Sequence, residues 1–263
     1  WVFDLLVDGQ LHQRVHPPVD AGEIEFIDLP DGAHPLELYL PSHYVPVTIQ
    51  SLEVDRDATV RPWLDERPRW ITYGSSITHC RHAHGPSETW PALVANWFGL
   101  NLTCLGYGGS CHVEPMVGRM IRDLSVDYIS LKLGANVVGG GSLSERTFRA
   151  AVIGMIKTIR DGHPDVPIGV VSPFFWPEHE SIPNEKGMTM PLAREVVEEA
   201  IRTLQKYGDR DLHYIDGLSI FGKEDEKYLT DEVHSGGDGQ HIIADRFSEL
   251  VMPELMGNRD RVE

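Results

Sequence analysis

A serine in a glycine-bearing turn, Gly74-Ser75-Ser76, is the first of four clusters whose residue types could do chemistry. A serine hydroxyl becomes a nucleophile when a histidine takes its proton and a carboxylate orients that histidine. Asp231 and His234 supply such a pair, because an aspartate three residues before a histidine can fold back to it within one turn. Two plainer interpretations stay open: Ser75 or Ser76 only caps a helix, and the Asp231–His234 pair lies in a polar surface loop.

Two further clusters could stabilise negative charge on an attacked carbonyl oxygen. Gly109 lies in the segment 106–110 (Gly-Tyr-Gly-Gly-Ser), where a residue without a side chain can present its backbone N–H. Asn136 follows an apolar run and can direct its amide NH₂ into the same crevice. A dinucleotide-binding loop is the rival interpretation of the glycines, but Cys111 occupies the place of its third glycine. A plain turn and a helix cap are the remaining alternatives for the two clusters.

The four clusters come directly after predicted strands of a parallel sheet, which would position them. From Pro62 on, five apolar runs alternate with amphipathic helical patterns, which indicates a five-stranded parallel sheet covered by helices on both faces. Reactive groups in such a sheet gather beyond the carboxyl ends of the strands. The four clusters follow the first, second, third and last runs. The predicted strands are 70–73, 100–105, 128–133, 168–171 and 212–215, and the predicted helices are 89–98, 113–124, 144–160, 191–207 and 239–252.

The region before Pro62 predicts a separate module. Runs with period-two alternation occur at 1–7, 23–28, 36–40 and 47–54, with turn residues such as Asp8-Gly9 between them. Four antiparallel strands make a thin sandwich, so we expect further strands before Trp1 or support from the following domain. The sequence thus predicts a β-sandwich-like module over 1–62, incomplete at its N-terminus, and a three-layer α/β/α catalytic domain over 63–263.

In this order the four clusters resemble the four blocks of the SGNH (GDSL-like) hydrolase and acyltransferase family, over about residues 69–255. The resemblance implies a flavodoxin-like α/β fold and a serine esterase that needs no cofactor. It implies that Ser76 is the nucleophile and that Asp231 and His234 complete a catalytic triad. The N–H groups of Ser76 and Gly109 and the amide of Asn136 would then form the oxyanion hole.

The sequence departs from the family pattern at three positions, which leaves the subgroup open. Ser75 stands where the family has Asp, Val137 follows Asn136 where a second Asp is usual, and Cys104 replaces a common Asn. The leading expectation is hydrolysis of a carboxylic ester, such as an O-acetyl group on a sugar or another small molecule. The alternatives are an acyltransferase that acylates a natural-product hydroxyl, and a non-catalytic binding protein on the same scaffold.

Other clusters receive a more modest interpretation. His79 and Trp176 are expected to line the substrate pocket, because each follows a predicted strand. The group of His79, Cys80, His82 and His84 matches no standard zinc-ligand spacing, so no metal is expected. The lipase motif G-x-S-x-G is absent, which argues against an α/β-hydrolase.

Composition limits the partners. A net charge of −17 repels nucleic acid and anionic membranes, so a small-molecule or carbohydrate ester is the expected partner. No apolar stretch of about 18 residues and no signal peptide are visible. The three cysteines do not make a disulfide framework, which favours a cytoplasmic over a secreted enzyme, although the chain begins at Trp1 rather than Met. The oligomeric state is not predicted.

Overall fold

A five-stranded parallel sheet forms the centre of the larger part of the molecule in the computed structural model, which describes residues 1–18, 20–42 and 46–257. Its strands are β4 (Arg69–Gly74), β5 (Asn101–Gly106), β6 (Tyr128–Lys132), β7 (Ile168–Val171) and β8 (Leu212–Ile215). Their order is β5-β4-β6-β7-β8, and all neighbours are parallel. The predicted α/β fold with five strands is confirmed.

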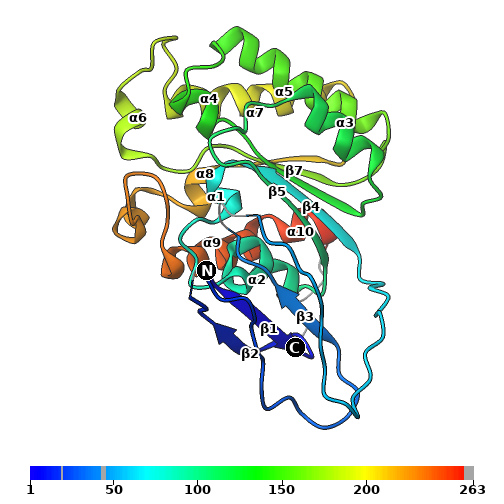
Figure 1. Cartoon of the computed structure of the whole chain (residues 1–263). Helices are drawn as coiled ribbons and strands as arrows, with labels where there is room; N and C mark the ends of the chain where they lie inside the picture. Colours follow the sequence, from blue (N-terminus) through cyan, green and yellow to red (C-terminus); the bar gives the residue numbers. More distant parts are fainter. Residues whose placement is uncertain (19, 43–45, 258–263) are drawn as a thin grey trace.

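Helices cover both faces of this sheet, giving three layers (Figure 1). One layer contains α3 (Pro115–Asp123), α4 (Ala135–Gly139), α5 (Glu145–Arg160) and α7 (Met190–Lys206). The other contains α2 (Trp90–Trp97), α8 (Gly217–Ile220), α9 (Gly237–Leu250) and α10 (Met252–Met256). Shorter helices occur in the connections: α1 (Ser76–His79), η1 (Pro86–Glu88), α6 (Pro177–Ser181) and η2 (Lys223–Tyr228). The predicted long helices match α2, α3, α5, α7 and α9 to within two residues at each end. Among the described residues, no helix is long and apolar enough to span a lipid bilayer.

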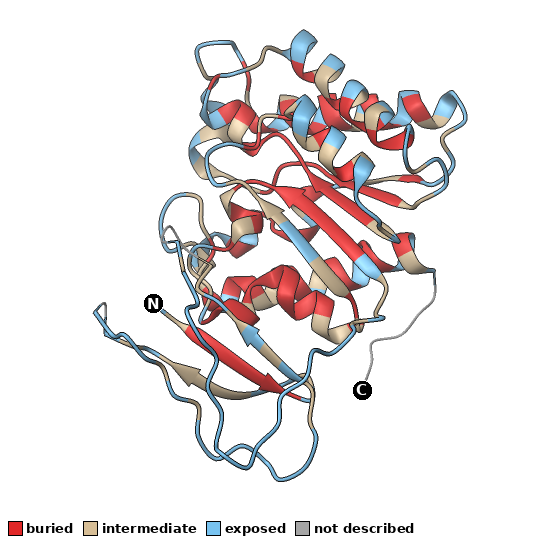
Figure 2. Cartoon of the chain, turned by 45° about the vertical axis from the view of Figure 1, so that its right-hand side comes forward, coloured by how far each residue is buried: buried red, intermediate tan, exposed pale blue. Residues whose placement is uncertain are grey.

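The inner strands β4, β6 and β7 are mostly apolar because both faces of the sheet are buried there, whereas the edge strand β5 is partly exposed (Figure 2). Trp70 of β4 packs with the α2–α9 layer, whereas its neighbour Ile71 packs with the α5–α7 layer. The indole N–H of Trp70 donates to the Ser130 hydroxyl at 3.1 Å, so its polar atom is satisfied inside the core. Each fully buried side chain of this size contributes about 1.5–3 kcal/mol of hydrophobic stabilisation.

The N-terminal region forms a small antiparallel sheet of β1 (Phe3–Val7), β2 (Gln10–Val15) and β3 (Leu36–Tyr39), in the order β2-β1-β3. Asp8 and Gly9 join β1 to β2 with φ of 51° and 76°, as a two-residue hairpin turn requires. The strand β2 was not predicted, and the predicted strands at 23–28 and 47–54 are wrong.

Segment 23–28 is held by side chains rather than by a backbone ladder, which explains why it is not a strand. The Ile27 N–H donates to Gln13 Oε1 at 3.0 Å, and the Ile27 carbonyl oxygen lies 2.9 Å from His12 Nε2. Both partners belong to β2. Side chains of β2 therefore satisfy the backbone groups that a neighbouring strand would otherwise pair.

A buried carboxylate joins the small sheet to the larger part. Asp4 of β1 is fully buried and accepts hydrogen bonds from Arg14 and from the N–H and hydroxyl of Ser87. Burial opposes the charge, but these hydrogen bonds hold the pKa of Asp4 below its ordinary value. Arg14 also pairs with Glu88 at 2.6 Å. The ion pairs therefore anchor β1 and β2 on η1, directly before α2.

Candidate active site

The chain turns sharply where β4 ends, and this turn presents Ser76. A Cβ on Gly74 would lie 2.2 Å from Thr78 Oγ1, so only glycine fits there. Ser75 is the N-cap of α1: its hydroxyl accepts the Ile77 N–H at 3.3 Å. The helix cap considered for Ser76 is therefore provided by Ser75. Ser76 becomes the first residue of α1.

Three side chains distant in the sequence form a hydrogen-bonded chain at this turn. Ser76 Oγ lies 2.7 Å from His234 Nε2, and His234 Nδ1 lies 2.8 Å from Asp231 Oδ2. Asp231 Oδ1 accepts the backbone N–H groups of Val233 and His234 at 2.8 and 2.7 Å. The loop thus folds the carboxylate back onto the imidazole within one turn, and the three residues predicted as a triad lie together.

Backbone donors keep the carboxylate of this group ionised. Burial raises the pKa of Asp231, but the N–H groups of His234 and Val233 and the imidazole outweigh it and lower the pKa to about 2. An ionised carboxylate favours the His234 tautomer with its proton on Nδ1. Nε2 is then the acceptor that faces the Ser76 hydroxyl.

Gly109 and Asn136, the other two predicted oxyanion residues, follow β5 and β6, the strands that flank β4. A Cβ on Gly108 would lie 3.6 Å from Ser76 Cβ, so the loop after β5 lies against the serine. Gly109 has a φ of 71°, and nothing lies within 4 Å of the position its Cβ would take. The Cys111 N–H donates to Asn136 Oδ1 at 3.1 Å, which fixes the amide of Asn136 at the start of α4. Its NH₂ group is thereby left as the donor.

His112 fixes the Gly109 loop, although sequence reasoning did not select it as a site residue. Its Nε2 lies 3.1 Å from the Gly109 carbonyl oxygen and its Nδ1 lies 2.8 Å from Ser142 Oγ. Its backbone N–H donates to Glu114 at 2.7 Å. The only sequence signal was a histidine three residues after Gly109. The contact shows that His112 holds the backbone around Gly109 in place.

His79 and Trp176 border the elements that carry the proposed oxyanion groups. His79 Nδ1 would lie 3.6 Å from a Cβ on Gly108. The Trp176 ring packs on α4, where a Cβ on Gly139 would lie 2.6 Å from its Cη2. The indole nitrogen of Trp176 is buried and has no hydrogen-bond partner among the described residues. The assignment of both residues to the substrate pocket stays a prediction.

A cavity opens on the Asp231 side of the site. It has a volume of about 690 Å³ and is lined by Pro177, Glu178, Glu226, Leu229, Asp231 and Glu232. A smaller hollow of about 340 Å³ lies at the opposite, amino-terminal end of the strands, beside Arg69 and Tyr128. The larger cavity is therefore the one that adjoins the Asp231–His234 loop.

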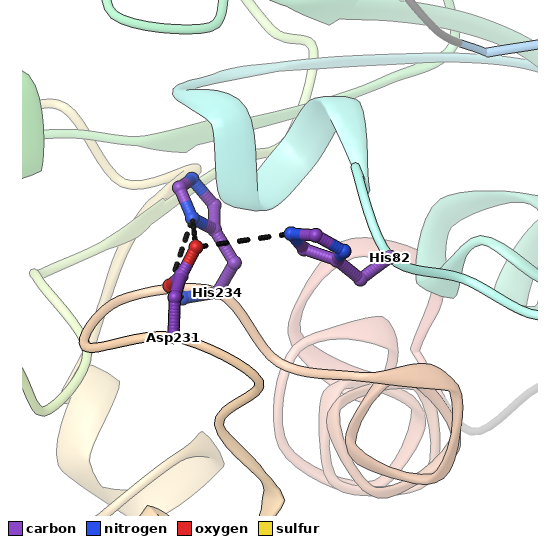
Figure 3. A group of neighbouring side chains, drawn as sticks. All are labelled: His82, Asp231 and His234. Carbon is purple, nitrogen blue, oxygen red and sulfur yellow. Dashed lines mark hydrogen bonds and ion pairs between the residues drawn. The ribbon is translucent and has the colours of Figure 1, made fainter.

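His82 contacts the loop that carries Asp231 and His234 (Figure 3). Its Nε2 lies 3.7 Å from Asp231 Oδ2, the same oxygen that lies 2.8 Å from His234 Nδ1. His82, Asp231 and His234 each offer one ligand atom, and these atoms lie within 4.8 Å of one another. They are the residues of the site that could hold a metal ion.

Comparison with known proteins agrees with this architecture. The chain belongs to the GDSL-like lipase/acylhydrolase family, whose sequence model matches residues 67–252. The resemblance to that family is thereby confirmed. No curated protein matches the chain.

Solved structures extend the likeness to the N-terminal sheet. A salicylyl-acyltransferase from a tetracycline biosynthetic pathway (SsfX3) is 32% identical with a TM-score of 0.82, covering 98% of this chain and 75% of its own. A putative GDSL-like lipase from Bacteroides ovatus is 21% identical with a TM-score of 0.74, and the match covers 99% of this chain and 76% of the lipase. A family two carbohydrate esterase from Clostridium thermocellum is 16% identical with a TM-score of 0.73, and the match covers 97% of this chain and 86% of the esterase. The last two share the fold.

Proposed function

We propose that this protein hydrolyses a carboxylic ester of a small molecule through an acyl-enzyme on Ser76. The observation that carries the proposal is the continuous hydrogen-bonded chain from the Ser76 hydroxyl through the His234 imidazole to the Asp231 carboxylate. Membership in a family of lipases and acylhydrolases supports the same chemistry.

The proposed reaction has two halves that use the same three residues. His234 Nε2 takes the proton of Ser76 as Oγ bonds to the ester carbonyl carbon, and Asp231 stabilises the imidazolium that forms. The ester C–O bond then breaks, and His234 returns the proton to the departing alcohol. In the second half His234 takes a proton from water, which attacks the acyl-enzyme and releases the acid and the free Ser76 hydroxyl.

The oxyanion would be stabilised by groups from three neighbouring loops. As the first residue of α1, Ser76 has a backbone N–H without an intrahelical partner. Gly109 offers a second N–H, and Asn136 offers its amide NH₂ while its oxygen is engaged by Cys111. Each such donor typically contributes about 3 kcal/mol to stabilisation of the transition state.

The exposure of the site favours hydrolysis as the second half-reaction. The Asp231 side chain is 44% exposed, and the His234 side chain is 18% exposed. Water therefore reaches the imidazole that must activate it. A cavity of about 690 Å³ beside Asp231 is large enough for a small alcohol or acyl group.

A second candidate is acyl transfer to a hydroxyl of a natural product. It is favoured by the 32% identity, over 98% of this chain, to a salicylyl-acyltransferase. The same triad would serve, with an alcohol in place of water in the second half-reaction. An O-acetylated sugar stays a substrate to be tested, since the likeness to a carbohydrate esterase extends to the fold alone.

Turnover of p-nitrophenyl acetate tests the proposal, with Ser76→Ala as the nucleophile variant and Ser75→Ala as its control. We expect Ser76→Ala to lose turnover and Ser75→Ala to keep most of it, because Ser75 only caps α1. Equal turnover by Ser76→Ala and the unmodified protein would overturn the assignment. Repeating the assay with alcohol acceptors separates the two candidates: product that carries the acceptor indicates the transferase.

A further inference from the structure

His82 is brought to the catalytic loop by the backbone after α1. Cys80 ends α1 in the left-handed region with a φ of 62°, and the chain then runs beside the loop that follows His234. His82 forms an isolated parallel bridge with Gly236. As a result its imidazole faces the Asp231 carboxylate beside that of His234, with the two ring centroids 5.8 Å apart (Figure 3).

The buried Nε2 atom of His82 makes no hydrogen bond within the described part of the chain. Nε2 is covered by the protein and has no hydrogen-bond acceptor or donor among the described residues. Its nearest oxygen, Asp231 Oδ2, is 3.7 Å away, which is beyond hydrogen-bond distance. An imidazole nitrogen that faces a carboxylate without a hydrogen bond to it is free to bind a cation together with that carboxylate.

The distances suit a transition-metal ion. Zinc binds imidazole nitrogen and carboxylate oxygen at about 2.0–2.2 Å, which places ligand atoms of a tetrahedral site roughly 3.3 Å apart. His82 Nε2 and Asp231 Oδ2 are 3.7 Å apart, and Asp231 Oδ2 and His234 Nδ1 are 2.8 Å apart. Small side-chain rotations therefore bring all three atoms to bonding distance. With three protein ligands, the fourth position is left for water.

We propose that His82, Asp231 and His234 form a site for a divalent transition-metal ion such as Zn²⁺, and that its occupancy inhibits the enzyme. The ion binds His234 at Nδ1, which catalysis requires to carry a proton. The neutral imidazole then holds its proton on Nε2, having exchanged it through solvent. Nε2 faces Ser76 as a donor instead of an acceptor, so it cannot take the hydroxyl proton. The binding site stands on geometry, whereas its inhibitory effect rests on the proposed function.

Charge and access support reversible binding. The three side chains are 33%, 44% and 18% exposed for His82, Asp231 and His234, so the site lies close to the protein surface. The adjoining cavity carries three further carboxylates, on Glu178, Glu226 and Glu232, which raise the local concentration of cations.

Binding is measured first without reference to activity, using Co²⁺ and Zn²⁺ on the full chain. Visible absorption of Co²⁺ and calorimetric titration with Zn²⁺ are recorded for the unmodified protein, Ser76→Ala, His82→Phe and His84→Phe. His84 is the matched control, because it lies two residues further on and pairs with Asp238 instead. We expect one equivalent to bind to the unmodified protein, Ser76→Ala and His84→Phe, with affinity at least tenfold lower in His82→Phe. Circular dichroism of each variant checks its folding, and His82→Gln provides a second substitution.

Inhibition is then measured by titrating Zn²⁺ into the p-nitrophenyl acetate assay, with EDTA added afterwards. We expect more than tenfold loss of turnover, recovered by EDTA, and an inhibition constant at least tenfold higher in His82→Phe than in His84→Phe. Absence of a bound equivalent, or equal binding by folded His82→Phe and His82→Gln, would overturn the site. Equal inhibition of His82→Phe and the unmodified protein would overturn its inhibitory role. His82-dependent binding to a protein without esterase turnover would support the site and refute the proposed function.

Discussion

Replacing Lys132 by Met tests how much the charge buried at the end of β6 lowers the free energy of unfolding. Lys132 ends β6 and is 4% exposed. Within the part of the chain that the structure describes, its Nζ has no hydrogen-bond partner, and it lies 4.3 Å from the centroid of the Phe174 ring. Burial lowers the pKa of Lys132 from the ordinary 10.5 to about 8.

The lowered pKa fixes both the sign and the magnitude of the effect. Folding weakens proton binding to Lys132, so the unfolded chain holds the extra proton between about pH 8 and 10.5. Stability therefore rises with pH across that window, and the full cost of the buried charge is present below it. A pKa lowered from 10.5 to about 8 corresponds to a cost of about 3 kcal/mol at pH 7.

Urea unfolding at pH 7, 8.5 and 10 measures this cost. Met has nearly the volume of Lys and no charge, so Lys132→Met should be more stable by about 3 kcal/mol at pH 7. The advantage should shrink towards pH 10. Lys157→Met on the exposed face of α5 is the control and should change stability little at any pH. A less stable Lys132→Met at pH 7, or a difference that does not vary with pH, would refute the reasoning.

Two further substitutions test the groups around the serine. Asn136→Ala should lower kcat for p-nitrophenyl acetate by about 10²–10³-fold with little change in KM, because it removes a proposed oxyanion donor; unchanged kcat would exclude that role. His112→Phe should lower kcat without abolishing it, since His112 holds the Gly109 carbonyl at 3.1 Å rather than touching substrate. If both residues act on the same oxyanion site, the fold-loss in kcat of the double variant His112→Phe/Asn136→Ala should be smaller than the product of the two single fold-losses. Steady-state kinetics of the three variants measures this, and a loss equal to the product would argue that the two residues act independently.

Residues buried on both faces made the parallel sheet predictable. Ile71 and Trp70 point to opposite layers, and both are apolar, so β4 appears in the sequence as an unbroken run. The N-terminal sheet was harder to predict because its outer strands β2 and β3 are partly exposed, although β1 is buried. Leu36 and Leu38 of β3 are exposed, and the alternation in segment 23–28 does not distinguish a strand from a segment held by the side chains of Gln13 and His12.

The site was predictable where it depends on the strand ends and not where it depends on loop contacts. The positions of Ser76, Asn136 and His234 follow from the rule that strand ends converge in a parallel sheet. The contact of His82 with Asp231 depends on a single backbone bridge to Gly236, for which the sequence contains no periodic signal. The role of Ser75 as the cap, which leaves the hydroxyl of Ser76 to His234, likewise needed coordinates.

The central claim is that Ser76 is the nucleophile, and labelling with a fluorophosphonate followed by peptide mapping tests it most directly. The reagent bonds only to a serine whose proton is taken by a neighbouring base. The account predicts one label per chain, on Ser76, in the unmodified protein and in Ser75→Ala, and none in Ser76→Ala. A label on Ser75 or on another residue, or full labelling of Ser76→Ala, would contradict it.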